Sequence, residues 1–476
     1  MTTLRYGAPE SVGVDPQAVR AFVQGVADAN HELHGFMIAR HDVVAAQGWW
    51  APYTSELPHL LYSLSKTFTA TAWAFAEAEG LVERDRPLIE YWPELASVPG
   101  PRARTWTAEQ LLRMASGHPI ETFVGLAIDD PRSGPDEIDG VAWCFAKEPE
   151  FEPGSIFAYN QLCTYLVAAT IQEVTGQTLV DYLRPRLFDP LGIGHATWQT
   201  DQWGRQLGFT GLFVHLEAAL KLGLLYLHRG VWQGQRLLPE AWFDAGLNPL
   251  SDTSLPLPDG TLRNPDWSQG YGYQVWMARH GYRGDGAFGQ FMLVLPELDV
   301  VIAINSGEQD MQAILNQVWR HLLPGLAGES AAAGGEPLTL TDLGMAPLSG
   351  HGPTAFFEAP QETYVHNGVT LLTPARQLRV VREGEHWVLG LGVLDGNVVI
   401  PAGDGVWLAS EMPGHEGPVE LRASAGWENG RFQARVILVM TPHSIVLEGR
   451  PDGTLDARWT TPPLRGTTLL DLGLPG

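Results

Sequence analysis

The feature that most constrains the fold is a helix with almost no polar face. After Ser63 the chain runs on as Leu64-Ser65-Lys66-Thr67-Phe68-Thr69-Ala70-Thr71-Ala72-Trp73-Ala74-Phe75-Ala76, and Gly80 follows. A helix that is apolar almost all round is buried inside a protein. The sequence therefore predicts a buried central helix that begins near Ser63 and ends near Gly80.

Ser63 and Lys66 lie three residues apart at the start of this helix. Residues i and i+3 share a helix face, so the two side chains can meet. A lysine held among apolar groups loses hydration, which disfavours its charged form, and a neutral amine beside a hydroxyl is a base beside a nucleophile. The exposed N–H groups and positive dipole of a helix start would stabilise an alkoxide there. The alternative is an ordinary serine and lysine on a solvated helix.

The bulk composition narrows the possible partners. The 476 residues exceed one ordinary domain, and 54 acidic against 30 basic residues give a net charge of −24. Such a surface repels nucleic acid and anionic membranes, so we expect neither as a partner. Cys144 and Cys163 are too few for a disulfide framework, and we expect two buried free thiols. The sequence shows no leader and no apolar run of 18 residues, which predicts a cytoplasmic protein, and we expect no metal and no cofactor.

The order of elements predicts an α+β fold for the first part of the chain. Short apolar runs predict a hairpin at 35–46, a strand at 271–279 and a second hairpin at 291–304, and mostly helical segments lie between the first hairpin and that strand. This arrangement predicts one sheet made of N- and C-terminal strands, with a helical lobe inserted. We assign residues 1–325 to this domain.

The residue composition and pattern change after residue 325. Residues 326–349 begin with a glycine- and alanine-rich stretch and are interpreted as a linker. From 350 to 476 short alternating runs are separated by turn signals such as Asn429-Gly430 and Asp452-Gly453. This pattern predicts a smaller all-β C-terminal domain, to which we assign no chemistry.

Three motifs occur in order along the chain: Ser63-x-x-Lys66, an aromatic motif at Tyr159 and a glycine-rich strand near Gly284. Two further segments support them, Leu111-Leu112-Arg113-Met114-Ala115-Ser116-Gly117-His118 and Leu187-Phe188-Asp189-Pro190-Leu191-Gly192. Together they resemble the serine β-lactamase and penicillin-recognising hydrolase superfamily. The likeness is strongest to esterase, class C-type and 6-aminohexanoate-dimer-hydrolase-like members. It implies a β-lactamase/transpeptidase-like antiparallel sheet with a helical lobe, and a serine hydrolase that works through an acyl-enzyme on Ser63.

The second motif of that family is Tyr-x-Asn, and here it is Tyr159-Asn160-Gln161. The resemblance implies that the Tyr159 phenol lies near the serine and lysine and relays protons. Gln161 stands where the family has asparagine, and Asn160 precedes it. Either amide could hold Lys66 or orient a substrate carbonyl.

The third motif is usually Lys-Thr-Gly or His-x-Gly, and here Gly284-Asp285-Gly286 takes its place. By this alignment the backbone N–H groups of Ser63 and Ala287 would form the oxyanion hole. The family cation commonly binds a substrate carboxylate, so its absence favours a neutral ester or amide. Arg283 precedes the motif, but on a strand its side chain lies on the face opposite Gly284.

The sequence is compatible with several functions. The first is an esterase or amidase on small neutral carbonyl substrates; the alternatives are a β-lactamase or D-alanyl-D-alanine carboxypeptidase, and a catalytically silent binding protein on the same scaffold. The partner would be a small ester, amide or lactam, and the oligomeric state stays open. The run from Gly284 to Gly289 fits Gly-x-Gly-x-x-Gly, but a β run follows it, whereas a dinucleotide site needs a helix.

Overall fold

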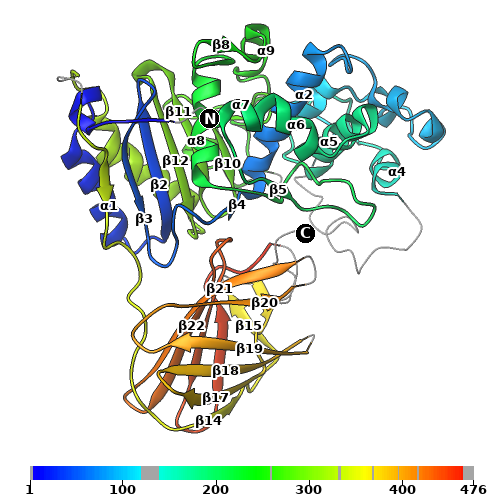
Figure 1. The fold of residues 1–476 in the computed structure, drawn as a ribbon. Coiled ribbons are helices and arrows are strands. Elements are labelled where there is room, and N and C mark those ends of the chain that lie inside the picture. Colours follow the sequence, from blue (N-terminus) through cyan, green and yellow to red (C-terminus); the bar gives the residue numbers. More distant parts are fainter. Residues whose placement is uncertain are drawn as a thin grey trace. The chain divides into compact units, whose positions relative to one another are not determined.

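The computed structural model describes residues 4–119, 139–257, 260–330, 334–366, 369–394, 396–414 and 417–464. Its internal contacts divide the chain into two compact units, Met1–Gly48 with Leu60–Thr341 and Trp49–His59 with Asp342–Gly476 (Figure 1). Parts of two predicted segments, 331–333 of the linker and 465–476 of the C-terminal domain, lie outside the described residues. The predicted domain boundaries stay a prediction.

The first unit is built on a sheet whose strands come from both ends of the unit (Figure 1). Within the described residues the strand order is β1-β3-β2-β12-β11-β10-β9, and β13 lies beside β3. The bounds are β1 Arg5–Tyr6, β2 Leu33–Arg40, β3 Val43–Trp49, β9 Trp276–Met277, β10 Tyr282–Gly286, β11 Gln290–Leu295, β12 Val300–Ser306 and β13 Leu338–Leu340. The pairs from β9 to β12 and on to β2 are antiparallel, but β1 and β13 run parallel to β3. The predicted α+β class is confirmed, with a mixed sheet because two short strands run parallel at one edge.

Helices cover both faces of this sheet. Gly223 of α8 (Leu216–Leu227) lies against Val301 so closely that a Cβ there would overlap the valine. Val301 pairs with Ala39, so alternation along β2 puts Phe36 on the other face. There Phe36 meets Phe22 of α1 (Pro16–Asp28) edge to face, with ring centroids 6.0 Å apart. The sheet is therefore a buried layer.

The helical lobe surrounds the predicted central helix. This helix, α2, spans Ser65–Ala78, and its residues up to Ala76 are buried. Its threonines tolerate burial because their hydroxyls have partners: Thr71 donates to the carbonyl of Thr67, and Thr67 to that of Gln274. The other elements of the unit are α3 Ala108–Leu112, α4 Gly140–Phe145, α5 Gln161–Thr175, α6 Leu179–Leu183, α7 Asp189–Leu191, α9 Glu240–Gly246, α10 Met311–Gln317, β4 His59–Leu60, β5 Thr197–Trp198, β6 Leu212–Val214, β7 Val231–Trp232 and β8 Gln235–Arg236. Across the described residues, every helix is too short or too polar to cross a lipid bilayer.

The segments around β9 and β10 were both interpreted from the sequence. The strand predicted at 271–279 is wrong for most of its length, because Gln274 has φ of 56° and its N–H bonds to the carbonyl of Leu112, so that only β9 remains extended. The run Gly284–Gly289 leads from β10 through a turn into β11. A strand and not a helix follows this run, so it lacks the helix N-terminus that a dinucleotide site needs.

The second unit is all-β, as predicted. Its described strands are β14 Ala355–Glu358, β15 Thr363–His366, β16 Val369–Leu372, β17 Gln377–Glu383, β18 His386–Val393, β19 Gly396–Gly403, β20 Leu408–Pro413, β21 Pro418–Glu428, β22 Arg431–Leu438, β23 Ser444–Gly449 and β24 Leu455–Trp459. The sheet runs from β14 to β24, and a bridge between Glu358 and Thr454 brings its two ends together as a nearly closed barrel. Trp387 and Phe432 fill its interior.

Residues 49–59 complete a small cluster in this second unit. Tyr53 is 5% exposed and packs with Ile437 and Val439. The unit is therefore not continuous in sequence. The alternating pattern after residue 350 did not indicate that residues 49–59 belong to it.

Candidate active site

Ser63 lies in a short 3-10 turn, Tyr62–Leu64, immediately before α2. Tyr62 has φ of 47°, and Phe288, in the turn after β10, has φ of 66°. Both conformations are costly for a residue with a Cβ and persist only when the surroundings hold them. The two rings meet edge to face at 5.4 Å, so each strained turn supports the other. The result is a fixed position for Ser63 beside the end of β10.

Lys66 reaches back from the first turn of α2 to this serine. Its Nζ donates to Ser63 Oγ at 2.9 Å and to the carbonyl oxygen of Phe209 at 2.8 Å. The side chain is only 1% exposed. Burial among apolar groups penalises an ammonium, and the two oxygen partners orient the amine toward the hydroxyl. The structure thus brings together the two residues that sequence spacing singled out.

Tyr159 lies over the same amine. Lys66 Nζ is 4.9 Å from the centroid of the Tyr159 ring, and the ring stacks on Trp276 at 5.5 Å with an interplanar angle of 19°. Tyr271 meets it edge to face at 6.0 Å. Cations are attracted to aromatic faces, and stacked rings hold one another in place. Tyr159 therefore belongs to the immediate surroundings of Ser63 and Lys66.

Asn160 and Gln161 lie at the start of α5, and their roles toward Lys66 or a substrate stay a prediction. Asn160 is the N-cap of α5, and its Oδ1 accepts from the N–H of Leu162 at 3.0 Å. An asparagine before an apolar helix is a capping signal, so this structural role was legible in the sequence. Within the described residues, Asn160 Nδ2 and Gln161 Oε1 are buried and have no hydrogen-bond partner.

The glycines of the third motif have a steric explanation. A Cβ at Gly284 would overlap Leu64 Cδ1 and lie 2.6 Å from Thr67 Oγ1, and one at Gly286 would overlap the carbonyl oxygen of Leu61. Strand β10 therefore runs directly against the turn that carries Ser63. A lysine or histidine has no space at Gly284, which accounts for the missing cation. The same approach brings the end of β10, followed by Ala287, beside that turn, but the oxyanion hole of Ser63 and Ala287 stays a prediction.

Asp285 is bound to Arg283 on the other face of β10. Arg283 Nε donates to Asp285 Oδ2 at 2.9 Å, and the two residues are 0% and 7% exposed. Burial raises the pKa of Asp285, and the Arg283 guanidinium acts against that rise. Asp285 was expected among the substrate-binding residues, and the structure gives it an internal partner.

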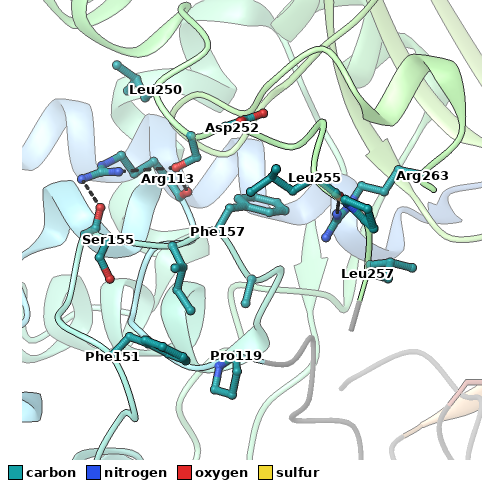
Figure 2. A pocket seen from close by; sticks show the side chains of 15 residues that line it. Arg113, Pro119, Phe151, Ser155, Phe157, Leu250, Asp252, Leu255, Leu257 and Arg263 are labelled. Carbon is teal, nitrogen blue, oxygen red and sulfur yellow. Dashed lines mark hydrogen bonds between the residues drawn. The ribbon is translucent and has the colours of Figure 1, made fainter. Parts of the chain in front are cut away.

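A cavity of about 400 Å³ lies next to this aromatic cluster (Figure 2). Phe157 is one of its lining residues, and its ring is 5.5 Å from that of Tyr271 and 5.7 Å from that of Trp276. The lining is mostly apolar and includes Phe151, Leu255 and Leu257, with Arg113 and Arg263 as cations. It is a candidate subsite for one side of a substrate.

Sequence reasoning missed three contributors to this site. Phe209 contributes a backbone carbonyl, which any residue could supply, so nothing in the sequence marks it. Trp276 falls in the run interpreted as a strand and gave no sign that Tyr159 would stack on it. Trp267, whose ring centroid lies 4.3 Å from Arg283 Cζ, likewise has no local signal.

A family model described as Beta-lactamase matches residues 17–320. The chain belongs to the beta-lactamase family. Its members are serine hydrolases that act on small ester, amide or lactam substrates. The family predicted from the three motifs is therefore confirmed.

Individual relatives of this beta-lactamase-family chain are distant. It is 29% identical over 147 residues to a protein named Beta-lactamase from Escherichia coli (strain K12), a match that spans 31% of this chain and 36% of that protein. It is 25% identical over 279 residues to the 6-aminohexanoate-dimer hydrolase of Paenarthrobacter ureafaciens, covering 56% of this chain and 70% of the relative. The octameric penicillin-binding protein homologue from Pyrococcus abyssi has a similar fold, with a TM-score of 0.50 and 15% identity over 90% of this chain and 97% of that one. This last likeness concerns the fold alone and extends into the all-β unit.

Proposed function

We propose that this family member is an esterase or amidase that cleaves small neutral carbonyl substrates through an acyl-enzyme on Ser63. The observation that carries the proposal is the 2.9 Å hydrogen bond between Lys66 Nζ and Ser63 Oγ, made by a lysine that is buried among aromatic rings. A nucleophile and a base within hydrogen-bond distance are the minimum that covalent acyl transfer needs.

Each residue of the site has a separate role in the proposed reaction. Lys66, in its neutral form, takes the proton of the Ser63 hydroxyl while Oγ attacks the carbonyl carbon. Tyr159, above the amine, passes the proton to the leaving alcohol or amine. The N–H groups of Ser63 and Ala287 stabilise the oxyanion. Water then attacks the acyl-enzyme with Lys66 and Tyr159 again managing the proton, and Ser63 is regenerated.

The substrate class follows from the third motif. Leu64 and Thr67 leave no space for a cation at Gly284, and Arg283 is buried with Asp285 as its partner. A substrate carboxylate would therefore find no dedicated partner on β10. The mostly apolar cavity around Phe157 suits a hydrocarbon acyl or alcohol group.

Two other functions have support of their own. β-Lactamase or D-alanyl-D-alanine carboxypeptidase activity is favoured by the names of relatives, among them the Escherichia coli Beta-lactamase and a Penicillin-binding protein 4 from Amycolatopsis lactamdurans. A silent binding protein is favoured by the departures from the family pattern at Gln161 and Gly284.

Covalent labelling tests the central claim. After exposure to a fluorophosphonate, we expect the intact mass to rise by one adduct, mapped to Ser63, in the native protein and in the remote control Ser11→Ala. Ser63→Ala should fold and take up no label. The absence of an adduct on the native protein would favour the silent scaffold.

A substrate panel on the same sample separates the enzyme classes. We expect kcat/KM for neutral p-nitrophenyl esters or amides to exceed that for a chromogenic cephalosporin. A cephalosporin value above the best ester value, lost in Arg263→Ala, would reverse this order and would make the cavity arginine an anion site.

A further inference from the structure

Arg283 is a buried cation in the wall of the site. Its side chain is 0% exposed; Nε donates to Asp285 Oδ2 at 2.9 Å and Nη1 to the carbonyl of Asp266 at 2.6 Å. Within the described residues its Nη2 is buried and has no hydrogen-bond partner. A buried guanidinium stays charged and needs a counter-charge, which Asp285 supplies.

A row of contacts leads from this pair to the proposed base. Arg283 Cζ lies 6.0 Å from the centroid of the Trp276 ring, Trp276 stacks on Tyr159 at 5.5 Å, and Tyr159 lies 4.9 Å from Lys66 Nζ. Asp285, bonded to Arg283 at 2.9 Å, lies at the end of this row, and the ammonium form of Lys66 acts to lower the pKa of its carboxyl, against the rise that burial causes. The Asp285 carboxylate therefore favours the ammonium form of Lys66, and the Arg283 guanidinium disfavours it.

Among the described residues, the other titratable groups around Lys66 and the pair carry no unbalanced charge. Burial raises the pKa of Cys163 to about 12 and that of Tyr271 well above its usual value, so both stay neutral. Asp266 is ionised, but Arg279 bonds to its carboxylate at 2.7 Å. Tyr159 is uncharged and presents its ring face to the amine; any attraction of that face for the ammonium form is the same in the native protein and in the variants. Arg283 and Asp285 are therefore the charges that decide the local balance.

We propose that Arg283 and Asp285 are positioning residues: the Arg283 guanidinium offsets the Asp285 carboxylate, so that Lys66 keeps the neutral form that attack by Ser63 requires. This inference rests on the proposed function. A lone carboxylate near Lys66 would favour the ammonium form, and Arg283 cancels that effect. A lone guanidinium would disfavour the ammonium form.

Removing one charge or both therefore gives different results. In Asp285→Asn the Arg283 cation stands alone, and the midpoint at which Lys66 becomes protonated should move to lower pH by about one unit. In Arg283→Met/Asp285→Asn neither charge remains, and the midpoint should return to within about 0.3 units of the native value. A merely structural role for Asp285 would not be reversed by removing a second side chain.

The chain allows this midpoint to be read directly, because Lys66, Lys147 and Lys221 are its only lysines. Lysine labelled with ¹³C at the ε position gives three NMR signals, assigned by Lys66→Arg and the corresponding variants at the other two. The pH titration of the Lys66 signal needs no substrate, whereas those of Lys147 and Lys221 serve as internal controls. The acid limb of kcat/KM is measured in parallel on the best ester, with Glu79→Gln, which breaks the distant Arg186 pair, as the matched variant.

Each outcome bears on the inference. A downward displacement in Asp285→Asn that is restored in the double variant supports it, and a kcat/KM limb that follows gives about a tenfold gain in rate at pH values below the native midpoint. An unmoved midpoint, or equal displacement in both variants, overturns it. If Asp285→Asn does not fold, Arg283→Met replaces it; the midpoint then rises, and an unmoved or lower midpoint contradicts the inference. A native protein that takes no fluorophosphonate label refutes the proposed function, while the NMR midpoints still decide the charge balance.

Discussion

Replacing Gly284 with alanine adds one methyl group at the point where β10 meets the turn of Ser63. The new Cβ would overlap Leu64 Cδ1 and lie 2.6 Å from Thr67 Oγ1. Leu64 is fully buried and immediately follows the nucleophile. The added methyl group must therefore push either the strand or the turn away.

The size of the effect follows from two opposing contributions. Alanine restricts the unfolded chain and would stabilise the protein by about 0.4–1 kcal/mol where it fits. Overpacking a buried site costs about 1–3 kcal/mol. We expect a net loss of about 1–2 kcal/mol, which lowers Tm by about 2–6 °C. Displacement of Leu64 also shifts Ser63, and we expect kcat/KM to fall by about tenfold.

Thermal and urea unfolding measure the stability, and ester hydrolysis measures the activity. Gly194→Ala is the matched control, because Gly194 has an ordinary φ and no atom lies within 4 Å of a Cβ built there. The control should be neutral or gain stability, opposite in sign to Gly284→Ala. In a Leu64→Val background the cost of Gly284→Ala should shrink, since the crowded methyl group is gone. A Gly284→Ala protein as stable and active as the native one would refute the steric account of the missing cation.

Three further predictions concern other parts of the chain. Lys66→Arg should lose nearly as much kcat/KM as Lys66→Ala, because arginine does not act as a base; native-like rates at neutral pH would mean that Lys66 works as a fixed charge. Burial acts to raise the pKa of Asp266, but hydrogen bonds from Arg279, Gln312 and Trp319 lower it from 3.8 to about 2. This carboxylate therefore stabilises the fold above about pH 4, and the contribution is lost as pH falls through about 2; Asp266→Asn should cost about 2 kcal/mol at neutral pH and remove that acid dependence in urea unfolding. Tyr53→Ala should destabilise the second unit by about 3 kcal/mol, seen as earlier proteolysis of its strands, whereas Tyr6→Ala, at an exposed position, should not; equal protection in both variants would contradict the assignment of residues 49–59 to that unit.

The sequence was informative where one helix or one alternating run carries its own evidence. The apolar stretch after Ser63 predicted the buried α2, and the spacing of Ser63 and Lys66 predicted their contact, because both follow from helical geometry within a few residues. The hairpins followed from short apolar runs separated by turn residues, and the all-β C-terminal domain followed from alternating runs and turn residues. The order of three motifs was enough to indicate the family.

Tertiary structure decided everything that depends on distant segments. The carbonyl of Phe209 reaches Lys66 across 143 positions, and a backbone oxygen has no side-chain identity for a sequence to reveal. The stack of Trp276 on Tyr159 depends on how a turn at Gln274 ends the predicted strand. The fit of Gly284 against Leu64 depends on the path of β10 past the serine turn, so the sequence showed a missing cation but not its cause. Local patterns fix local geometry, whereas these contacts arise only when packing brings the two sides of the site together.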